Sequence, residues 1–125
     1  MNFTYSKKEK LKSRKLIDSL FVKGKSVSKY PIKLIYLKTE VQENAIIQAG
    51  VAVPKRNFKS AVKRNRIKRL LREAYRLNKH QVFNNSEDAF AFLFLYLGKE
   101  MPDFVNIDRD MKAVLSKFLE REKLS

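Results

Sequence analysis

The segment that most constrains the fold of this 125-residue chain is the apolar run 89–97, which reads AFAFLFLYL. Large side chains occupy both alternating positions of the run, so a β-strand formed here is apolar on both faces. Such a strand lies in the interior of a sheet, or is at least well covered. Nine residues are too few to cross a bilayer as a helix. The run therefore predicts a well-covered strand of a sheet.

Hydrophobic periodicity predicts five further elements. Apolar residues at helical spacing indicate amphipathic helices over about 13–23, 59–78 and 107–122. Runs of strand-forming residues indicate strands over about 32–37 and 45–53. Ser13 and Asn106 are the expected N-caps, Gly24 ends the first helix, and Gly50 marks a bulge or a close approach of the backbone. The order αββαβα predicts an α+β fold, and the chain length suits a single domain over 1–125.

The net charge of +15 is concentrated in one part of the chain. Residues 55–79 carry eleven basic side chains and one acidic side chain, Glu73, whereas residues 80–125 carry six basic and eight acidic ones. Residues 1–10 are polar and basic, and we expect them to form a flexible arm. A compact domain with this charge repels itself, so we expect a polyanionic partner.

Composition argues against several classes of protein. The chain has no Cys and a single His, which excludes disulfides and argues against a His-based metal site or catalytic triad. No carboxylate cluster suited to two metal ions lies near the basic segment, so a protein-only nuclease is not expected. We predict no catalytic and no metal-binding residue. No apolar signal-peptide core follows the basic N-terminus, so we expect a cytoplasmic protein without a membrane partner.

Helical geometry divides the side chains of the basic segment between two faces. One face is an apolar stripe formed by Ile67, Leu70, Leu71 and Ala74. The opposite face is a polar and cationic row formed by Asn65, Arg69, Arg72 and Arg76. Like charges four residues apart, such as Lys68 and Arg72, disfavour a helix unless an anion neutralises them. Because Arg offers a planar fork of donors to phosphate, RNA binding is favoured over a merely solvated face.

Two adjoining motifs resemble the signature of the bacterial ribonuclease P protein family. They are VAVPKR at 51–56 and AVKRNRIKRLLREAYR at 61–76, and the triplet Arg64-Asn65-Arg66 is the hallmark of that family. The resemblance extends upstream to Leu11, Phe21, Gly24 and Ser26 and covers roughly residues 7–120. It implies a two-layer α/β sandwich with a small mixed sheet of about four strands and a left-handed βαβ crossover around the basic helix. Periodicity reveals three strands, so we expect the fourth near Phe58 or near Ser26.

The resemblance also implies a function. Family members are the protein subunit of ribonuclease P, in which the RNA subunit is the catalyst and cleaves precursor tRNA with Mg²⁺ to make the mature 5′ end. The expected partners are therefore ribonuclease P RNA and precursor tRNA, with one protein monomer per RNA subunit. The protein itself is expected to hold no cofactor and not to cleave alone, but to raise the affinity of the holoenzyme for metal ions.

Carried over by position, the resemblance implies two sets of site residues. The RNA-binding set is Lys55, Arg56, Lys63, Arg64, Asn65, Arg66, Lys68, Arg69, Arg72 and Arg76. The set expected to line a cleft for the single-stranded 5′ leader is Arg14, Ile17, Phe21, Lys33, Ile35 and Tyr36. Ile17 and Ile35 stand where the family has aromatic residues, and Tyr36 lies on the opposite side of the pleat from Ile35. The cleft is therefore expected either to stack bases less strongly or to use different side chains, such as Lys33.

Two alternatives remain open from the residues alone. The chain could be another basic RNA-binding protein, of the ribosomal or RNA-chaperone type. A DNA-binding helix protein is disfavoured, because no second helix at turn spacing accompanies the basic one.

Overall fold

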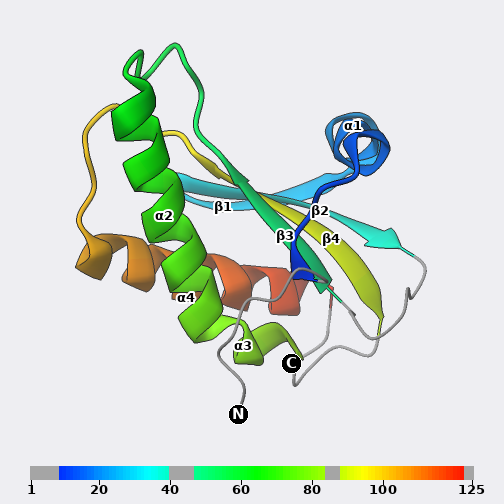
Figure 1. The fold of residues 1–125 in the computed structure, drawn as a ribbon. Helices are drawn as coiled ribbons and strands as arrows, with labels where there is room; N and C mark the ends of the chain where they lie inside the picture. The colour runs from blue at the N-terminus through cyan, green and yellow to red at the C-terminus, as the bar shows by residue number, and fades with distance from the viewer. Residues whose placement is uncertain (1–8, 40–46, 84–87, 123–125) are drawn as a thin grey trace.

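Four helices and four strands lie within the described residues, which are 9–39, 47–83 and 88–122 of this computed structural model (Figure 1). The elements are α1 Arg14–Lys23, β1 Lys25–Lys29, β2 Ile32–Thr39, β3 Ile47–Ala52, α2 Ala61–Asn78, α3 His80–Phe83, β4 Ala89–Tyr96 and α4 Phe104–Arg121. They form the expected α+β fold. The short α3 had not been predicted, and residues 45 and 46 of the second predicted strand lie outside the described residues.

The four strands form one mixed sheet in the order β1-β2-β4-β3. β2 is antiparallel to both β1 and β4, whereas β3 is parallel to β4. In β4, Phe92 lies opposite Tyr36 of β2 on one side and opposite Ala49 of β3 on the other. The apolar run is thus an interior strand, as its sequence predicts.

The fourth strand is β1, so the expected position near Ser26 is confirmed and the alternative near Phe58 is wrong. Phe58 lies in the connection before α2, where its buried ring packs into the main core. β1 reads KSVSK, and Val27 is its residue that packs against that core. An edge strand with so little buried surface has no hydrophobic signature, and its Lys and Ser residues discourage pairing with other chains.

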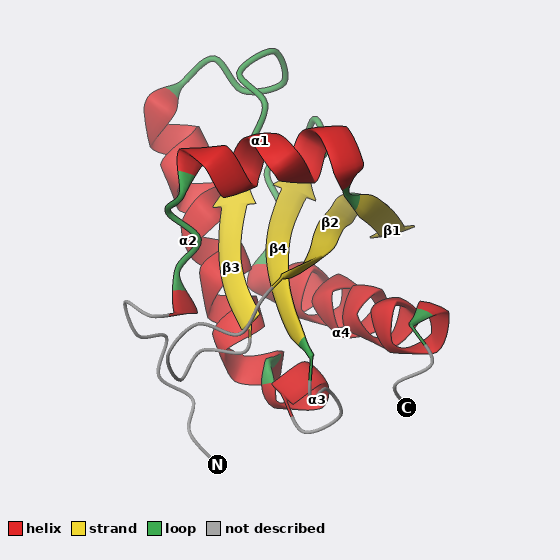
Figure 2. Cartoon of the chain, turned by 90° about the vertical axis from the view of Figure 1, so that its right-hand side faces the viewer, coloured by secondary structure: helices red, strands yellow, loops and turns green. Residues whose placement is uncertain are grey.

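The connection from β3 through α2 to β4 is left-handed. In Figure 2, α1 lies in front of the sheet and α2 behind it, both parallel strands point upward, and β4 lies to the right of β3. A chain that rises in β3, returns behind the sheet and rises again to the right follows a left-handed path. Almost all such crossovers are right-handed, so the family resemblance identified the hand where general rules would have failed.

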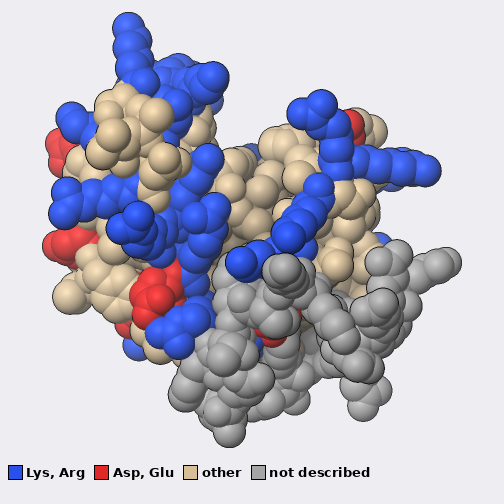
Figure 3. Space-filling view, viewed as in Figure 1, with Lys and Arg blue, Asp and Glu red and all other residues tan. Residues whose placement is uncertain are grey.

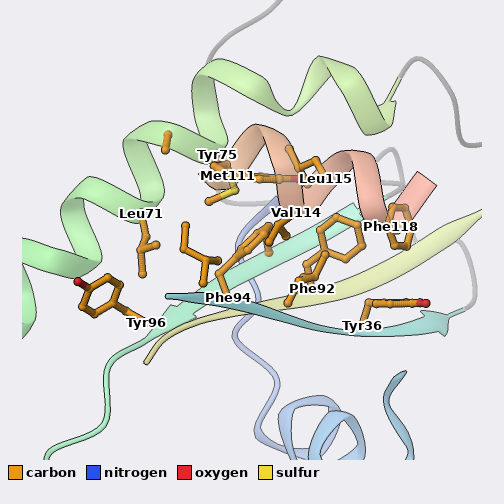
Figure 4. Packing of buried hydrophobic residues seen from close by; sticks show 14 of the residues in the cluster. Tyr36, Leu71, Tyr75, Phe92, Phe94, Tyr96, Met111, Val114, Leu115 and Phe118 are labelled. Carbon is orange, nitrogen blue, oxygen red and sulfur yellow. The ribbon is translucent and has the colours of Figure 1, made fainter. Parts of the chain in front are cut away.

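The main core fills the space between the sheet and helices α2 and α4 (Figure 4). Aromatic rings of β4 project into it, and Phe92 and Phe94 are fully buried. The Phe118 ring of α4 makes edge-to-face contacts with Tyr36 and Phe92, with ring centroids 4.8 and 4.9 Å apart. Such edge-to-face contacts stabilise the fold beyond the contribution that comes from burying the rings.

A smaller cluster lies on the opposite face of the sheet, beneath α1 (Figure 2). Its buried members are Leu11, Leu20, Ile35, Ala91 and Leu93. Since α1 has ten residues, it covers part of this face and adds a partial layer to the main sandwich. Both faces of β4 are therefore covered, as the apolar run requires.

The helix ends follow their capping side chains. Ser13 accepts a hydrogen bond from Leu16 N at 3.2 Å and caps α1, as predicted. The last helix begins three residues earlier than predicted, because Asp103 is its N-cap and Asn106 is not. The Asp103 carboxylate accepts a hydrogen bond from the Asn106 backbone N–H at 2.8 Å. A negatively charged side chain at this position is also stabilised by the positive end of the helix dipole.

Residues 9–12, here called the N-terminal strap, lie along the free edge of β3. Lys10 pairs in parallel with Ala49, and Leu11 N donates to Ala49 O at 2.9 Å. The Glu9 carboxylate forms an ion pair of 2.6 Å with Lys79. The prediction of a flexible arm is therefore wrong for Glu9 and Lys10, because sheet pairing and an ion pair hold them, while residues 1–8 lie outside the described residues.

Candidate nucleic-acid interface

Helix α2 displays a cationic face whose direction is set by its buried side. Ile67, Leu71 and Ala74 are fully buried, and Leu70 packs at the border of the main core, so the predicted stripe is confirmed. The side chains left outward are exposed or half-buried and form what we call the α2 cationic face: Asn65, Arg66, Lys68, Arg69, Arg72 and Arg76. Sequence periodicity thus predicted correctly which residues of the helix face solvent.

The row weakens toward its C-terminal end. Arg76 bonds Glu73 through Nε at 3.2 Å and through a second guanidinium nitrogen at 2.5 Å. The hydrogen bond from Arg76 holds the pKa of Glu73 below its usual value, and the same bond raises the pKa of Arg76. Glu73 is therefore ionised at neutral pH and offsets the charge of Arg76, so Asn65, Arg69 and Arg72 carry the exposed part of the row.

Arg64 has a structural contact that the sequence did not reveal. One nitrogen of its guanidinium donates to Phe58 O at 2.7 Å and to Lys59 O at 2.9 Å. These bonds brace the connection that leads into α2, alongside the N-cap Ser60, which accepts from Lys63 N at 3.3 Å. Arg64 is half-buried, so its remaining donors stay available to a ligand.

Cationic side chains continue beyond the N-terminus of α2. Lys55 and Arg56 before the helix, like Lys63 in its first turn, are exposed, as a nucleic-acid interface requires. Arg56 borders a hollow of about 640 Å³ together with Lys99, which follows β4 and was not among the predicted residues. Lys99 was not predicted because it lies far from the basic segment along the chain, and spacing rules do not connect residues on separate loops.

The predicted cleft lies on the face of the sheet that α1 crosses. Lys and Arg side chains stand on both sides of a hollow between α2 and α1 in the space-filling view (Figure 3). Arg14 is exposed at the start of α1, and Phe21 near its end has 59% of its surface exposed. Lys33 of β2 is half-buried on this same face. All three side chains are thus at least partly accessible to solvent.

Two of the predicted cleft residues are less accessible. Ile17 is half-buried against the cluster beneath α1, and Ile35 lies within that cluster. Neither can present a broad surface for stacking. The prediction that Tyr36 lines the cleft is wrong, because the alternation of β2 turns its side chain into the main core, where it is 1% exposed. Its hydroxyl donates to the Glu122 carboxylate at 2.8 Å.

Burial of the Tyr36 hydroxyl should make the free energy of unfolding depend on pH. Burial and the hydrogen bond to Glu122 raise the pKa of Tyr36 to about 12. Because an unfolded tyrosine loses its proton near pH 10, the folded state holds the proton more tightly above that pH. We therefore expect the free energy of unfolding to fall as the pH rises from about 10 to about 12.

Chemical denaturation of the wild type and of Tyr36→Phe over this pH range measures the effect. The variant should also lose about 1 kcal/mol of stability at pH 7, through the hydrogen bond to Glu122. A variant as steeply pH-dependent as the wild type would contradict the assignment.

A pocket of about 240 Å³ joins the cleft to the α2 cationic face. Arg72 of α2 and Ile17 of α1 contribute to its walls, together with the N-terminal strap and the residues around Gly50 of β3. One residue of each predicted set, Arg72 and Ile17, therefore lines the same pocket. The structure also shows the strap as part of this wall, which spacing along the sequence could not.

Among the helices that the structure describes, none combines the length and apolarity needed to cross a bilayer. Within residues 9–39, 47–83 and 88–122, no three His, Cys, Asp or Glu side chains come together in a way that could hold a metal ion.

Comparison with known proteins gives a consistent result. A family model described as Ribonuclease P matches residues 5–119. The chain is 39% identical over 116 residues to the ribonuclease P protein component of Porphyromonas gingivalis, covering 90% of this chain and 85% of that protein. It is 36% identical over 122 residues to the ribonuclease P protein component of Chlorobium phaeobacteroides, covering 87% and 84%.

Solved structures show the same fold. The RNase P protein from Thermotoga maritima superposes with a TM-score of 0.70 at 23% identity, covering 87% of this chain and 96% of that chain. The RNase P protein from Staphylococcus aureus gives 0.68 at 21% identity, covering 88% and 94%.

Proposed function

Because this chain belongs to the ribonuclease P family and is a protein subunit of ribonuclease P, we propose that its α2 cationic face binds the ribonuclease P RNA. The observation that carries the proposal is the row Asn65, Arg69 and Arg72, exposed on a helix whose other side is locked into the core. Since the buried stripe prevents α2 from rotating, all three side chains project from the solvent side of the helix. Guanidinium groups suit phosphate oxygens, to which they can donate two bonds at once.

The cleft under α1 is proposed to hold the single-stranded 5′ leader of precursor tRNA. Its chemistry supports this assignment, because α1 carries the exposed Arg14 and the exposed Phe21 ring, and β2 carries Lys33 on the face of the sheet beneath α1. Single-stranded RNA is bound by stacking on side chains and by a cationic groove along its backbone. With Ile17 and Ile35 in place of aromatic residues, the cationic side chains are expected to contribute most of the affinity for the leader.

The same proposal assigns different roles to the RNA and the protein in the holoenzyme. The RNA subunit would carry out the cleavage with Mg²⁺, and the protein, which we expect to be monomeric, would position RNA without a catalytic residue or cofactor of its own. The cytoplasmic location predicted from the sequence stays a prediction.

Reconstitution tests the proposed function directly. The protein is mixed with a bacterial ribonuclease P RNA and precursor tRNA at low Mg²⁺, and the rate of 5′ cleavage is compared with that of the RNA alone. We expect stimulation, because added cationic side chains reduce the repulsion between the two RNAs. Cleavage that is no faster with the protein than without it would overturn the proposal.

Replacing Arg69 with Ala should lower the salt dependence of binding to the ribonuclease P RNA. Each phosphate contact contributes about 0.7 to 0.9 to the slope of log affinity against log salt, so one lost contact should reduce the slope by about that amount. Binding is measured at several salt concentrations. Lys29→Ala is the control, because Lys29 is exposed on β1, the edge strand farthest from β3, and forms no ion pair among the described residues. Equal slopes for Arg69→Ala and the wild type would mean that Arg69 does not face RNA.

A further inference from the structure

The N-terminal strap is held at both of its ends. On one side, the Glu9–Lys79 ion pair has side chains that are 12% and 3% exposed. Breaking such a pair by removing one partner leaves a poorly solvated charge, so the pair resists opening. On the other side, Ser13 begins α1 as its N-cap. The backbone hydrogen bond from Leu11 N to Ala49 O fixes the middle of the strap against β3. The strap is thus a built part of the sheet edge.

The pocket between the strap and α2 combines cations with an apolar floor. Lys10, Lys12 and Arg72 provide its charged rim. Ile17 of α1 and Leu93 of β4 contribute apolar lining. Its volume of about 240 Å³ lies a little below that of pockets for drug-sized ligands, which start near 300 Å³. A single unstacked nucleotide matches this size and this mixture of surfaces.

Gly50 keeps the pocket open. A Cβ atom at this position would lie 3.3 Å from Leu11 Cβ and 3.5 Å from Leu11 Cδ2. A larger side chain would have to push the strap away from β3 or fill the pocket itself. The glycine therefore permits both the close approach of the strap and the depth of the hollow beside it.

We propose that the N-terminal strap is a wall of the leader-binding cleft and that Lys12, which lines the same pocket as Arg72, binds the backbone of single-stranded RNA there. This inference rests on the proposed function. One phosphate would lie between the two cationic side chains, and the adjoining base would lie on Ile17 and Leu93. Within the described residues neither Lys12 nor Arg72 forms an ion pair, so both charges are available to an anion. Duplex RNA could not use the apolar floor, because its bases are stacked.

The proposal assigns a positioning role to Glu9 and Lys79. Neither needs to touch RNA, because the ion pair acts by keeping the strap against β3. This role explains why a basic chain retains a largely buried carboxylate beside its RNA-binding helix. It also predicts that loosening the pair displaces Lys12 without changing the charge of the pocket rim.

The test uses the reconstituted holoenzyme with two substrates, precursor tRNA carrying a single-stranded 5′ leader and the same tRNA without it. Lys12→Ala should raise the Kd for the leader-bearing substrate about fivefold and lower its salt slope by about 0.7. Binding of the leaderless tRNA should not change. Lys29→Ala is the matched control, because Lys29 is exposed on β1, the edge of the sheet farthest from β3.

Each alternative outcome is distinct. If Lys12→Ala behaves like Lys29→Ala while Arg69→Ala still weakens binding to the ribonuclease P RNA, the strap inference fails and the proposed function stands. If Arg69→Ala has no effect either, the proposed function fails with it. Equal weakening with and without the leader would place Lys12 against the RNA subunit or the tRNA body, and would overturn the assignment to the leader.

Glu9→Gln tests the positioning role separately. We expect faster hydrogen exchange at the Leu11 amide, whose bond to Ala49 O the ion pair protects, together with weaker binding of the leader-bearing substrate alone. Lys12 itself is unchanged in this variant. Faster exchange without any loss of leader binding would contradict the role of the strap as a wall of the cleft.

Discussion

Replacing Phe118 with Ala should lower the free energy of unfolding by about 3–5 kcal/mol, a range typical of large buried aromatic side chains. The Phe118 side chain is fully buried in the middle of α4. Its ring centroid lies 4.8 to 5.0 Å from those of Tyr36, Phe90 and Phe92, so truncation removes three edge-to-face contacts and leaves a cavity. Chemical denaturation monitored by circular dichroism measures the loss.

Phe21→Ala makes the same chemical change at an exposed position and serves as its control. Because 59% of the Phe21 surface is already in contact with solvent, we expect a loss of less than about 1 kcal/mol. Similar losses for the two variants would contradict the described core, in which α4 closes over β2 and β4.

The double variant Arg69→Ala with Arg72→Ala should bind the ribonuclease P RNA about 30-fold more weakly at moderate salt. The estimate takes about 1 kcal/mol for each exposed cationic contact, and about 1.4 kcal/mol corresponds to a tenfold change in Kd. Both side chains point outward from α2, so the fold should tolerate their removal. Titration of labelled RNA with each protein gives the ratio of Kd values.

Lys29→Ala with Lys112→Ala is the control for net charge. It also removes two cationic side chains, but from exposed positions on β1 and α4. If affinity depended only on the total charge of the protein, the two double variants would bind RNA equally weakly. We expect the control variant to stay within about threefold of the wild type, since charge far from the contact is screened by salt.

The α2 cationic face could be predicted from the sequence because it depends on local helix geometry. A residue every 100° or so around a helix places Ile67 and Leu71 on one side and Arg69 and Arg72 on the other, whatever surrounds the helix. The structure bears this out. The interior position of β4 followed in the same way, since a strand with large apolar residues on both faces has to be covered on both.

Features without a local signature were missed or misplaced. β1 escaped notice because an edge strand with a single residue packed against the core has no apolar alternation. Asp103 and Asn106 are both residue types that suit the N-cap of α4, and the sequence alone does not decide between them. Which of them caps the helix depends on where the chain leaves the sheet. Tyr36 was included in the cleft although the pleat turns it away from Ile35.

By itself, the sequence determined which side of α2 is buried, which strand lies inside the sheet and where the positive charge is concentrated, because these depend on residue periodicity and composition. Tertiary structure alone decided that Glu9 meets Lys79 and that Lys12 shares a pocket with Arg72. Such pairs are separated by many residues, and only the path of the folded backbone brings them together. The apolar run 89–97 thus predicted a covered strand, whereas the fold decided which helices cover it.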